Sequence, residues 1–349
     1  MNDVSALIQA AAAAQASDIH LVCGLPPKYR VNGELCNICE EVLTHAQCES
    51  YARQLASERY DEIAEIGELD MAASYDEVRV RINLFRQQGH VSSAIRLLSD
   101  RIPDVNTLGL PDAALKLPAL HSGIVLVTGE TGSGKSTTLA AMLDSVNHSR
   151  SDHIITLEDP IEYIYTPDKC VINQREIGKD TQSYADGLRA ILREDPDVIL
   201  IGEMRDLNTI ETALTAAETG HLVFSTLHTN SAADSMDRII NVFPQGQQKQ
   251  IAMQLSMTLK AVISQQLVKR TGGGRILACE FMIVNDAIRN LIREGKTPQI
   301  NNALSTSAQE GGITMDNMLI GLYKAKKIDA QTAQNAARDA EYVKKNTRF

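Results

Sequence analysis

The sequence predicts an α/β protein built as two domains, and three observations carry that expectation. The chain has 349 residues, which exceeds the size at which a single hydrophobic core usually stops growing. Beyond residue 122, short and wholly apolar runs alternate with helical segments, which is typical of a parallel sheet covered on both faces. Three prolines and a glycine interrupt residues 100–120, so we place the domain boundary there.

The N-terminal part, residues 1–98, has the pattern of a mixed α/β module. Residues 2–16 predict a helix, and the alternation over 17–22 predicts a strand. A second strand is expected at 28–31, followed by Asn32-Gly33, a dipeptide typical of tight hairpins. Residues 44–65 return to helical spacing, and apolar and polar residues alternate over 77–85. The order is therefore helix, two strands, helix, strand.

The second part starts after the breaker-rich segment 99–120, which we interpret as a linker. Its expected strands are 124–128, 153–157, 198–201 and 222–226. The expected helices between them are 135–147, 183–194 and 209–219. After residue 245 the pattern is almost entirely helical. We therefore divide this part into a core domain at 121–270 and a C-terminal helical region at 271–349.

Charge and composition exclude several classes of protein. The 34 basic and 44 acidic residues give a net charge of −10, which disfavours general binding to nucleic acid because phosphate backbones are repelled. The longest apolar runs are far shorter than the roughly 20 residues that a transmembrane helix needs, and no export signal opens the chain. We expect a cytoplasmic protein. The six cysteines, with one CxxC at Cys36 and Cys39, predict reduced thiols rather than a disulfide framework or a zinc site.

Residues 129–137 form a complete GxxxxGK[ST] P-loop between an apolar run and a helix. In such a loop the glycines turn backbone N–H groups toward phosphate oxygens, and the helix N-terminus adds positive potential. Lys135 would reach the β and γ phosphates, and Ser136 would hold a magnesium ion. The predicted nucleotide-binding residues are Gly129, Thr131, Gly132, Ser133, Gly134, Lys135, Ser136 and Thr137. A glycine-rich loop without a ligand is the alternative.

Acidic residues follow two of the expected strands. Glu158 and Glu162 come directly after 153–157, and Glu203 follows 198–201 in the manner of a Walker B acid. Ligands lie at the carboxyl ends of strands in open α/β sheets, so one acid should bind magnesium and another should activate the attacking water. Glu203 and Glu158 join Ser136 as candidate magnesium ligands. The alternative is that these acids cap helix N-termini.

Histidines and arginines complete the set of candidate catalytic residues. His221 and His228 flank the strand expected at 222–226, and His228 at its carboxyl end is the better placed to contact a γ-phosphate. Arginines can stabilise the charge that spreads over the transferred phosphoryl group. The candidates are Arg81, Arg96, Arg189 and Arg193. By chemistry alone, each of these four arginines is more often a solvated or ion-paired surface residue.

Taken together, the motifs resemble the secretion and type IV pilus motor ATPases. The resemblance rests on GETGSGKSTT, ITLEDPIEY at 155–163, LREDPDVILIGEMRD at 192–206 and TALTAAETGHLVFSTLHTNSA at 212–232. It runs over nearly the whole chain. It implies a PAS-like N-terminal domain, a RecA-like ATPase domain with C-terminal helices, and a ring of six copies with nucleotide between the two domains.

Within the family, the retraction branch matches best. AIRNLIRE at 287–294 and SDIH with GLPP at 17–27 resemble its sequences, and the four-cysteine insertion of many assembly and secretion members is missing after Val268. This implies a hexamer that hydrolyses ATP with Mg²⁺ to drive pilus retraction. The protein would work at the inner face of the cytoplasmic membrane, through an inner-membrane platform protein and without nucleic acid.

The resemblance also implies a role for each candidate residue. Glu162 would be the general base, Glu203 the Walker B acid, and His221 and His228 the two histidines of the family's His box. The arginines around the phosphates would be Arg81, Arg96, Arg189 and Arg193, the first two from the N-terminal domain. Two departures are Glu130, where the family commonly has proline, and residues 329–349, which match only loosely.

Three alternatives remain open from the sequence. A pilus-assembly or secretion ATPase would share the chemistry and differ in its output. A nucleotide-gated regulatory subunit would bind ATP without hydrolysing it, which the intact Glu162, Glu203 and His228 disfavour. A DNA-translocating pump of RecA type would require a chain less acidic than this one.

Overall fold

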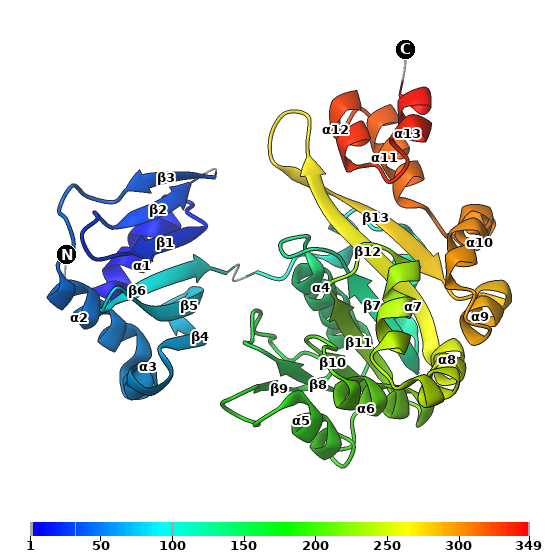
Figure 1. The fold of residues 1–349 in the computed structure, drawn as a ribbon, viewed down its shortest axis with the longest axis horizontal. Helices are drawn as coiled ribbons and strands as arrows, with labels where there is room; N and C mark the ends of the chain where they lie inside the picture. The colour runs from blue at the N-terminus through cyan, green and yellow to red at the C-terminus, as the bar shows by residue number, and fades with distance from the viewer. Residues whose placement is uncertain (1–2, 32, 99–100, 348–349) are drawn as a thin grey trace. The chain divides into compact units, whose positions relative to one another are not determined.

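The chain forms two compact units in a computed structural model that describes residues 3–31, 33–98 and 101–347 (Figure 1). Unit 1 comprises Met1–Arg101 together with Pro160–Ile164, and unit 2 comprises Ile102–Asp159 and Tyr165–Phe349. Asn32 of the expected hairpin turn and positions 99–100 of the expected linker lie outside the described residues, as do residues 1, 2, 348 and 349.

Unit 1 is built on an antiparallel sheet of six strands in the order β3-β2-β1-β6-β5-β4. The strands are β1 (Asp18–Leu21), β2 (Lys28–Val31), β3 (Glu34–Asn37), β4 (Glu68–Tyr75), β5 (Val78–Gln87) and β6 (His90–Leu97). The helices are α1 (Val4–Ala13), α2 (His45–Ala56) and α3 (Tyr60–Ile66), with a 3₁₀ turn at Ser57–Arg59. The helices and strands expected for this part are confirmed, whereas β3, β4 and β6 were not anticipated from the sequence.

Alternation along β5 decides which face of this sheet is buried. Val80, Ile82 and Leu84 are buried in a cluster that includes residues of α1, α2 and α3. Successive side chains of a strand point to opposite faces, so Arg79 and Arg81 occupy the other face. Unit 1 therefore presents basic side chains on the face that the three helices leave uncovered.

Unit 2 contains a sheet of seven strands in the order β13-β12-β7-β11-β10-β8-β9, in which only the β12–β13 pair is antiparallel. The strands are β7 (Gly123–Thr128), β8 (His153–Glu158), β9 (Val171–Glu176), β10 (Val198–Ile201), β11 (Leu222–Leu227), β12 (Leu259–Lys269) and β13 (Arg275–Ile283). The first helices are α4 (Lys135–Ser149), α5 (Tyr184–Ile191), α6 (Leu207–Glu218), α7 (Ala232–Asn241) and α8 (Gln245–Thr258). The later ones are α9 (Asp286–Arg293), α10 (Ile300–Thr306), α11 (Met315–Lys324), α12 (Ala330–Ala336) and α13 (Ala340–Asn346). The expected parallel-sheet core is confirmed.

The expectation that the chain is almost entirely helical after residue 245 is wrong. Residues 259–283 form the long hairpin β12–β13, and β12 pairs in parallel with β7 and lies inside the sheet. Polar residues conceal this strand in the sequence. Gln265 and Ser264 are buried, and the Thr128 hydroxyl donates a buried hydrogen bond of 2.9 Å to Ser264 Oγ. Tertiary pairing, rather than local pattern, decides the conformation here.

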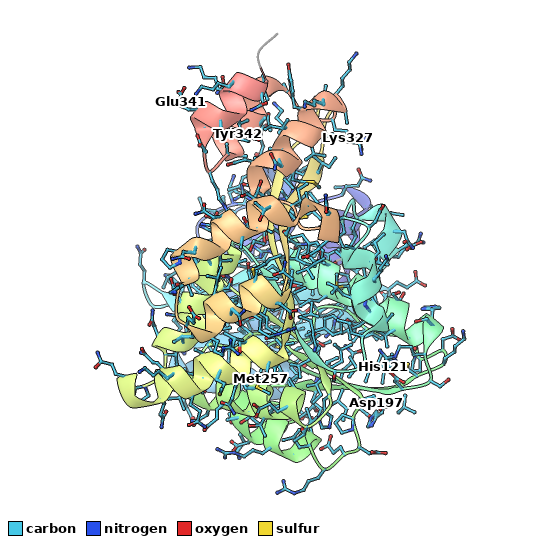
Figure 2. All side chains as sticks on the ribbon, turned by 90° about the vertical axis from the view of Figure 1, so that its right-hand side faces the viewer. His121, Asp197, Met257, Lys327, Glu341 and Tyr342 are labelled. Carbon is cyan, nitrogen blue, oxygen red and sulfur yellow. The ribbon has the colours of Figure 1, made fainter. Side chains whose placement is uncertain are left out.

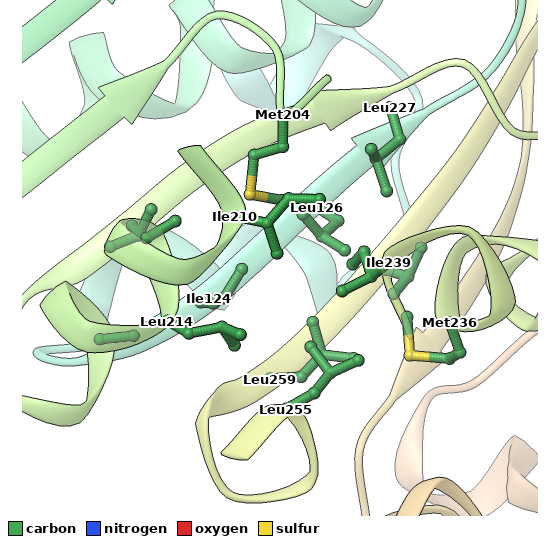
Figure 3. Close-up of a cluster of buried hydrophobic side chains, with 14 of the residues drawn as sticks. Ile124, Leu126, Met204, Ile210, Leu214, Leu227, Met236, Ile239, Leu255 and Leu259 are labelled. Atoms are coloured by element: carbon green, nitrogen blue, oxygen red, sulfur yellow. The ribbon is translucent and has the colours of Figure 1, made fainter. Parts of the chain in front are cut away.

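The main hydrophobic core of unit 2 lies on one face of its sheet. Ile124 and Leu126 of β7 contribute to a buried cluster with Ile210 of α6 and Leu255 of α8 (Figure 3). The alternate residues of β7 point to the opposite face, where α4 packs against β7 and β11. Helices thus cover both faces, as a parallel sheet requires.

The segment expected as a linker is part of unit 2 from residue 102 onward. It forms 3₁₀ turns at Val105–Thr107 and Ala114–Ala119 that pack against α4, and the Arg150 side chain donates a 3.0 Å hydrogen bond to the Pro118 carbonyl. The six cysteines are unpaired. None of the helices in the described parts of the chain is both long and apolar enough to span a bilayer.

Candidate active site

The candidate site lies at the carboxyl edge of the unit 2 sheet. Strands β7, β11, β10 and β8 are parallel neighbours, so their C-terminal ends meet at one edge. The P-loop follows β7, Glu158 ends β8, Glu203 follows β10 and His228 follows β11. The parallel order of these strands brings together four segments that are far apart in the sequence.

At the first position of the P-loop, the backbone conformation and the close packing allow only glycine. Gly129 has φ +140°, and a Cβ there would lie 2.3 Å from the Gln265 carbonyl oxygen on β12. Gly134, at φ +93°, is the N-cap of α4. Lys135 is only 8% exposed, and its Nζ donates to the carbonyls of Gly129 at 2.7 Å and Glu130 at 2.9 Å. The ammonium is thus held inside the loop, while Thr131 and Ser136 are exposed.

A cavity of about 360 Å³ adjoins the P-loop. Its lining residues come from the P-loop, β12, β13, the segment after β11 and the C-terminal helices: Glu130, Thr131, Gly132, Ser133, Asn230, Gln265, Gln266, Leu267, Arg275, Met315, Ala336 and Arg338. Two buried polar atoms of this lining, Ser133 Oγ and Gln265 Oε1, have no hydrogen-bond partner. Buried polar atoms normally have one, so polar groups of a ligand would satisfy them. The volume is at the lower end of the range for small-molecule sites.

Glu203 and His228 meet at the ends of β10 and β11. The Oε2 atom of Glu203 lies 3.4 Å from His228 Nε2 and accepts a 2.8 Å hydrogen bond from Arg205 Nε. The Glu203 side chain is 16% exposed, whereas His228 and Arg205 are open to solvent. The carboxylate is therefore partly buried and oriented by two cationic or potentially cationic groups.

Tyr184, Gly202 and Arg205 belong to the same neighbourhood, and sequence reasoning missed them. A Cβ at Gly202 would lie 2.8 Å from the Tyr184 hydroxyl, so the tyrosine packs against the turn that leads into Glu203. Burial raises the pKa of Tyr184, and the charges of Asp159, Glu158 and Glu203 raise it further. No local motif marks Tyr184, because only α5 packing on β8 brings it there.

The candidate magnesium ligands fit that role chemically. Ser136 lies in the first turn of α4, and Glu158 Oε1 accepts hydrogen bonds from Thr156 Oγ1 at 2.7 Å and Gln174 Nε2 at 3.2 Å. Mg²⁺ in nucleotide sites is usually bound by one or two carboxylates, waters and substrate phosphates. A hydroxyl and two carboxylates at the edge that carries the P-loop match this pattern.

Glu162, the expected general base, belongs to unit 1 through the segment Pro160–Ile164. Arg79 of β5 donates two hydrogen bonds to the Ile161 carbonyl, from Nε at 3.2 Å and from Nη2 at 2.8 Å. Arg81 Nη1 lies 3.9 Å from Glu162 Oε1, and Nη2 of the same guanidinium forms a closer pair with Asp70 at 2.6 Å. The acidic box is therefore anchored on the basic face of the unit 1 sheet.

The other candidate residues lie as follows. Arg96 is the direct cross-strand neighbour of Arg81 and pairs with Asp18 at 3.0 Å. Arg189 is exposed on α5, and Arg193 Nη1 donates to its carbonyl. His221 precedes β11, where its Nδ1 lies 2.8 Å from the Ala216 carbonyl oxygen. Because the P-loop adjoins the opposite end of that strand, this chain does not itself bring His221 to the P-loop.

The chain was compared with known proteins and structures. The family model described as "Type II/IV secretion system protein" matches residues 1–318. The type IV pilus retraction ATPase PilT of Pseudomonas aeruginosa is 44% identical over 97% of this chain and 99% of its own length. A twitching motility protein of Neisseria gonorrhoeae is 42% identical over 90% of this chain and 85% of its own. A crystal structure of the pilus retraction motor PilT with bound ADP has a TM-score of 0.90 and 46% identity, covering 97% of this chain and 98% of that one.

Proposed function

Because the chain belongs to the Type II/IV secretion system protein family, we propose that it is an ATP-hydrolysing motor of the pilus-retraction type. The observation that carries this conclusion is the complete P-loop, with Lys135 held inside it, in a chain that matches a retraction motor over nearly its full length. The sequence leaves both pilus retraction and pilus assembly open as the work that the motor performs. The match to retraction motors supports retraction.

Nucleotide binding follows from the P-loop geometry. The N–H groups of the loop and of the first turn of α4 would donate to the β and γ phosphate oxygens, assisted by the helix dipole. Lys135 would exchange its bonds to the Gly129 and Glu130 carbonyls for phosphate oxygens, so a preformed ammonium site costs little reorganisation. Ser133 Oγ would donate to the same anion.

Hydrolysis requires a base, an oriented carboxylate and positive charge around the γ-phosphate. We assign the base to Glu162, which would take the proton of the attacking water, and the oriented carboxylate to Glu203 with His228 beside it. When bound, Mg²⁺ supplies charge neutralisation at the phosphates, and Ser136, Glu203 and Glu158 would hold it.

The assembly is part of the proposal. In a ring of six copies, Arg81, Arg96, Arg189, Arg193 and His221 would act on phosphates or at boundaries between subunits. The chain would work in the cytoplasm at the inner face of the membrane, where a platform protein embedded in that membrane transmits its work to the pilus. Nucleic acid has no part in this cycle.

Phosphate release from ATP by the purified full-length protein tests the proposal. We expect a rate that depends on Mg²⁺. Lys135→Ala should abolish ATP binding. Glu162→Gln should bind ATP normally, and its rate of hydrolysis should fall by about 100-fold or more. Lys345→Ala, which removes an exposed lysine of α13, serves as the control with wild-type rates. Normal ATP binding by wild type without any phosphate release would contradict a motor and favour the regulatory alternative.

A further inference from the structure

The C-terminal helices α11, α12 and α13 form a small domain-like cluster packed on the β12–β13 hairpin. Leu319 of α11, Ala333 of α12 and Val343 of α13 are buried together with Val268 and Ala278 of the hairpin. Figure 2 shows Lys327 in the turn between α11 and α12, and Glu341 and Tyr342 on α13. The catalytic roles assigned above use none of these residues.

Arg338, between α12 and α13, connects this cluster to the interior of unit 2. Its Nη1 donates to a carboxylate oxygen of Glu280 on β13, and its Nη2 donates to the carbonyl of Asn230. Glu280 is only 2% exposed, and its Oε1 accepts a 2.9 Å hydrogen bond from the backbone N–H of Ala232, the first residue of α7. One buried carboxylate therefore joins the C-terminal segment to the start of α7.

A carboxylate at this depth depends on its cationic partner. Desolvation disfavours the charged form of a buried acid, and the pKa of Glu280 is raised by burial even though Arg338 acts to lower it. Removing the guanidinium would leave the carboxylate buried without compensating charge, which is costly in folded proteins. The ion pair is therefore a strong constraint on where residues 336–339 lie.

The backbone around Arg338 is fixed from two further sides. Asp316 of α11 accepts hydrogen bonds from the N–H groups of Arg338 at 2.8 Å and Asp339 at 3.1 Å. Gln266 of β12 donates a 2.9 Å hydrogen bond to the Ala336 carbonyl. The guanidinium thus projects from a rigid turn rather than from a loose tail.

The same turn lines the cavity beside the P-loop. Ala336, Arg338 and Asn230 are lining residues together with Glu130 and other P-loop residues. Asn230 is two residues beyond His228, so the carbonyl that Arg338 holds belongs to the segment that carries the chain from His228 into α7. Ser133 and Gln265, whose buried Oγ and Oε1 atoms have no hydrogen-bond partner, also line this cavity.

We infer that Arg338 is a positioning residue of the nucleotide site: paired with Glu280, it fixes the segment after His228 and closes the cavity beside the P-loop with the C-terminal turn. This inference rests on the proposed function, because it takes the cavity to receive part of the nucleotide bound at the P-loop. It gives the turn at residues 336–339 a role in nucleotide affinity.

Nucleotide binding and turnover of full-length variants test the inference. Arg338→Ala should raise both the Kd for ADP and the KM for ATP about ten-fold, and lower kcat less. Glu280→Gln should give a similar effect, and the double variant should be no worse than the stronger single variant because both remove one interaction. Arg338→Lys should recover part of the affinity, since a lysine can pair with Glu280 but lacks the planar fork that also reaches Asn230.

Thermal unfolding and the control Lys345→Ala separate this role from simple stabilisation. Lys345→Ala should leave Kd and KM at wild-type values. If Arg338→Ala fails to fold, Arg338→Lys and Glu280→Gln carry the same test. A lower Tm with unchanged Kd and KM in the folded variants would overturn the inference. Wild-type protein that bound neither ATP nor ADP would instead remove the proposed function itself.

Discussion

At the scale of single residues, the site depends on how closely the chain approaches itself at the P-loop. Gly129 lies against the carbonyl of Gln265, and Lys135 lies inside the loop on two carbonyls. These contacts join β7, α4 and β12 at one point. A small increase in side-chain volume there should therefore affect both the stability of the fold and the binding of nucleotide.

Gly129→Ala should therefore lose nucleotide binding and destabilise the protein by about 2–4 kcal/mol, because the new Cβ would overlap the Gln265 carbonyl at 2.3 Å. Gly246→Ala is the matched control, since Gly246 lies in the first turn of α8, where a Cβ would meet nothing within 4 Å. It should bind nucleotide normally and unfold within about 1 kcal/mol of wild type. Chemical denaturation and ADP titration measure both effects, and an unaffected Gly129→Ala would show that the loop tolerates a side chain.

Contiguous motifs are enough to predict most residues of the candidate site, whose roles stay predictions, and only tertiary contacts bring further residues beside them. Lys135, Ser136 and Glu203 lie in short patterns whose spacing carries chemical meaning. Tyr184 and Arg338 reach the site only because α5 packs on β8 and the C-terminal turn packs on β13. No spacing rule links such residues to the P-loop in the sequence.

At the scale of elements, two segments have a conformation or a packing partner that their local sequence does not predict. The hairpin β12–β13 supplies Gln265 and Glu280 from a stretch that local patterning assigns to helix. The segment Pro160–Ile164 leaves the β8 strand end and packs on the sheet of unit 1. The strands of the parallel core were predictable because short, continuous apolar runs are typical of strands buried on both faces. Strands that contain buried polar residues lack this pattern and were not predictable.

The anchoring of the acidic box predicts a specific kinetic defect. Arg79→Ala removes both hydrogen bonds to the Ile161 carbonyl, so Glu162 should lose its fixed position while the P-loop is untouched. We expect kcat to fall about ten-fold or more with little change in ADP affinity. Arg86→Ala, an exposed arginine on the same strand, is the control and should keep the wild-type kcat. An equal fall in kcat for both variants, or a loss of ADP affinity in Arg79→Ala, would count against this role.

At the scale of the whole molecule, the proposed motor needs several copies of the chain acting together. Arg81 and Arg96 are neighbours on one face of unit 1, already engaged with Asp70 and Asp18. Glu162 belongs to the same unit as these arginines, whereas the P-loop belongs to unit 2. If the arginines serve phosphates bound by the P-loop of a neighbouring subunit, an arginine variant and a P-loop variant damage different partners of the same boundary between subunits.

Mixing tests this arrangement. Arg96→Ala and Lys135→Ala proteins should each be nearly inactive in phosphate release, and a mixture that is allowed to exchange subunits should recover part of the wild-type rate. The recovery arises because some boundaries then combine an intact arginine of one subunit with an intact P-loop of its neighbour. A mixture no more active than the sum of its two separate proteins would contradict action between subunits. The mass of the assembly with bound nucleotide should correspond to six copies of the chain.

The number of pili on cells that lack the gene, in the organism that encodes this chain, tests most sharply whether the motor retracts pili. A retraction motor predicts an excess of surface pili that do not retract, together with loss of twitching motility. Restoring the gene should reverse both, and restoring it as Lys135→Ala should not. Deletion cells without pili would contradict the account, because they would assign this ATPase to pilus assembly.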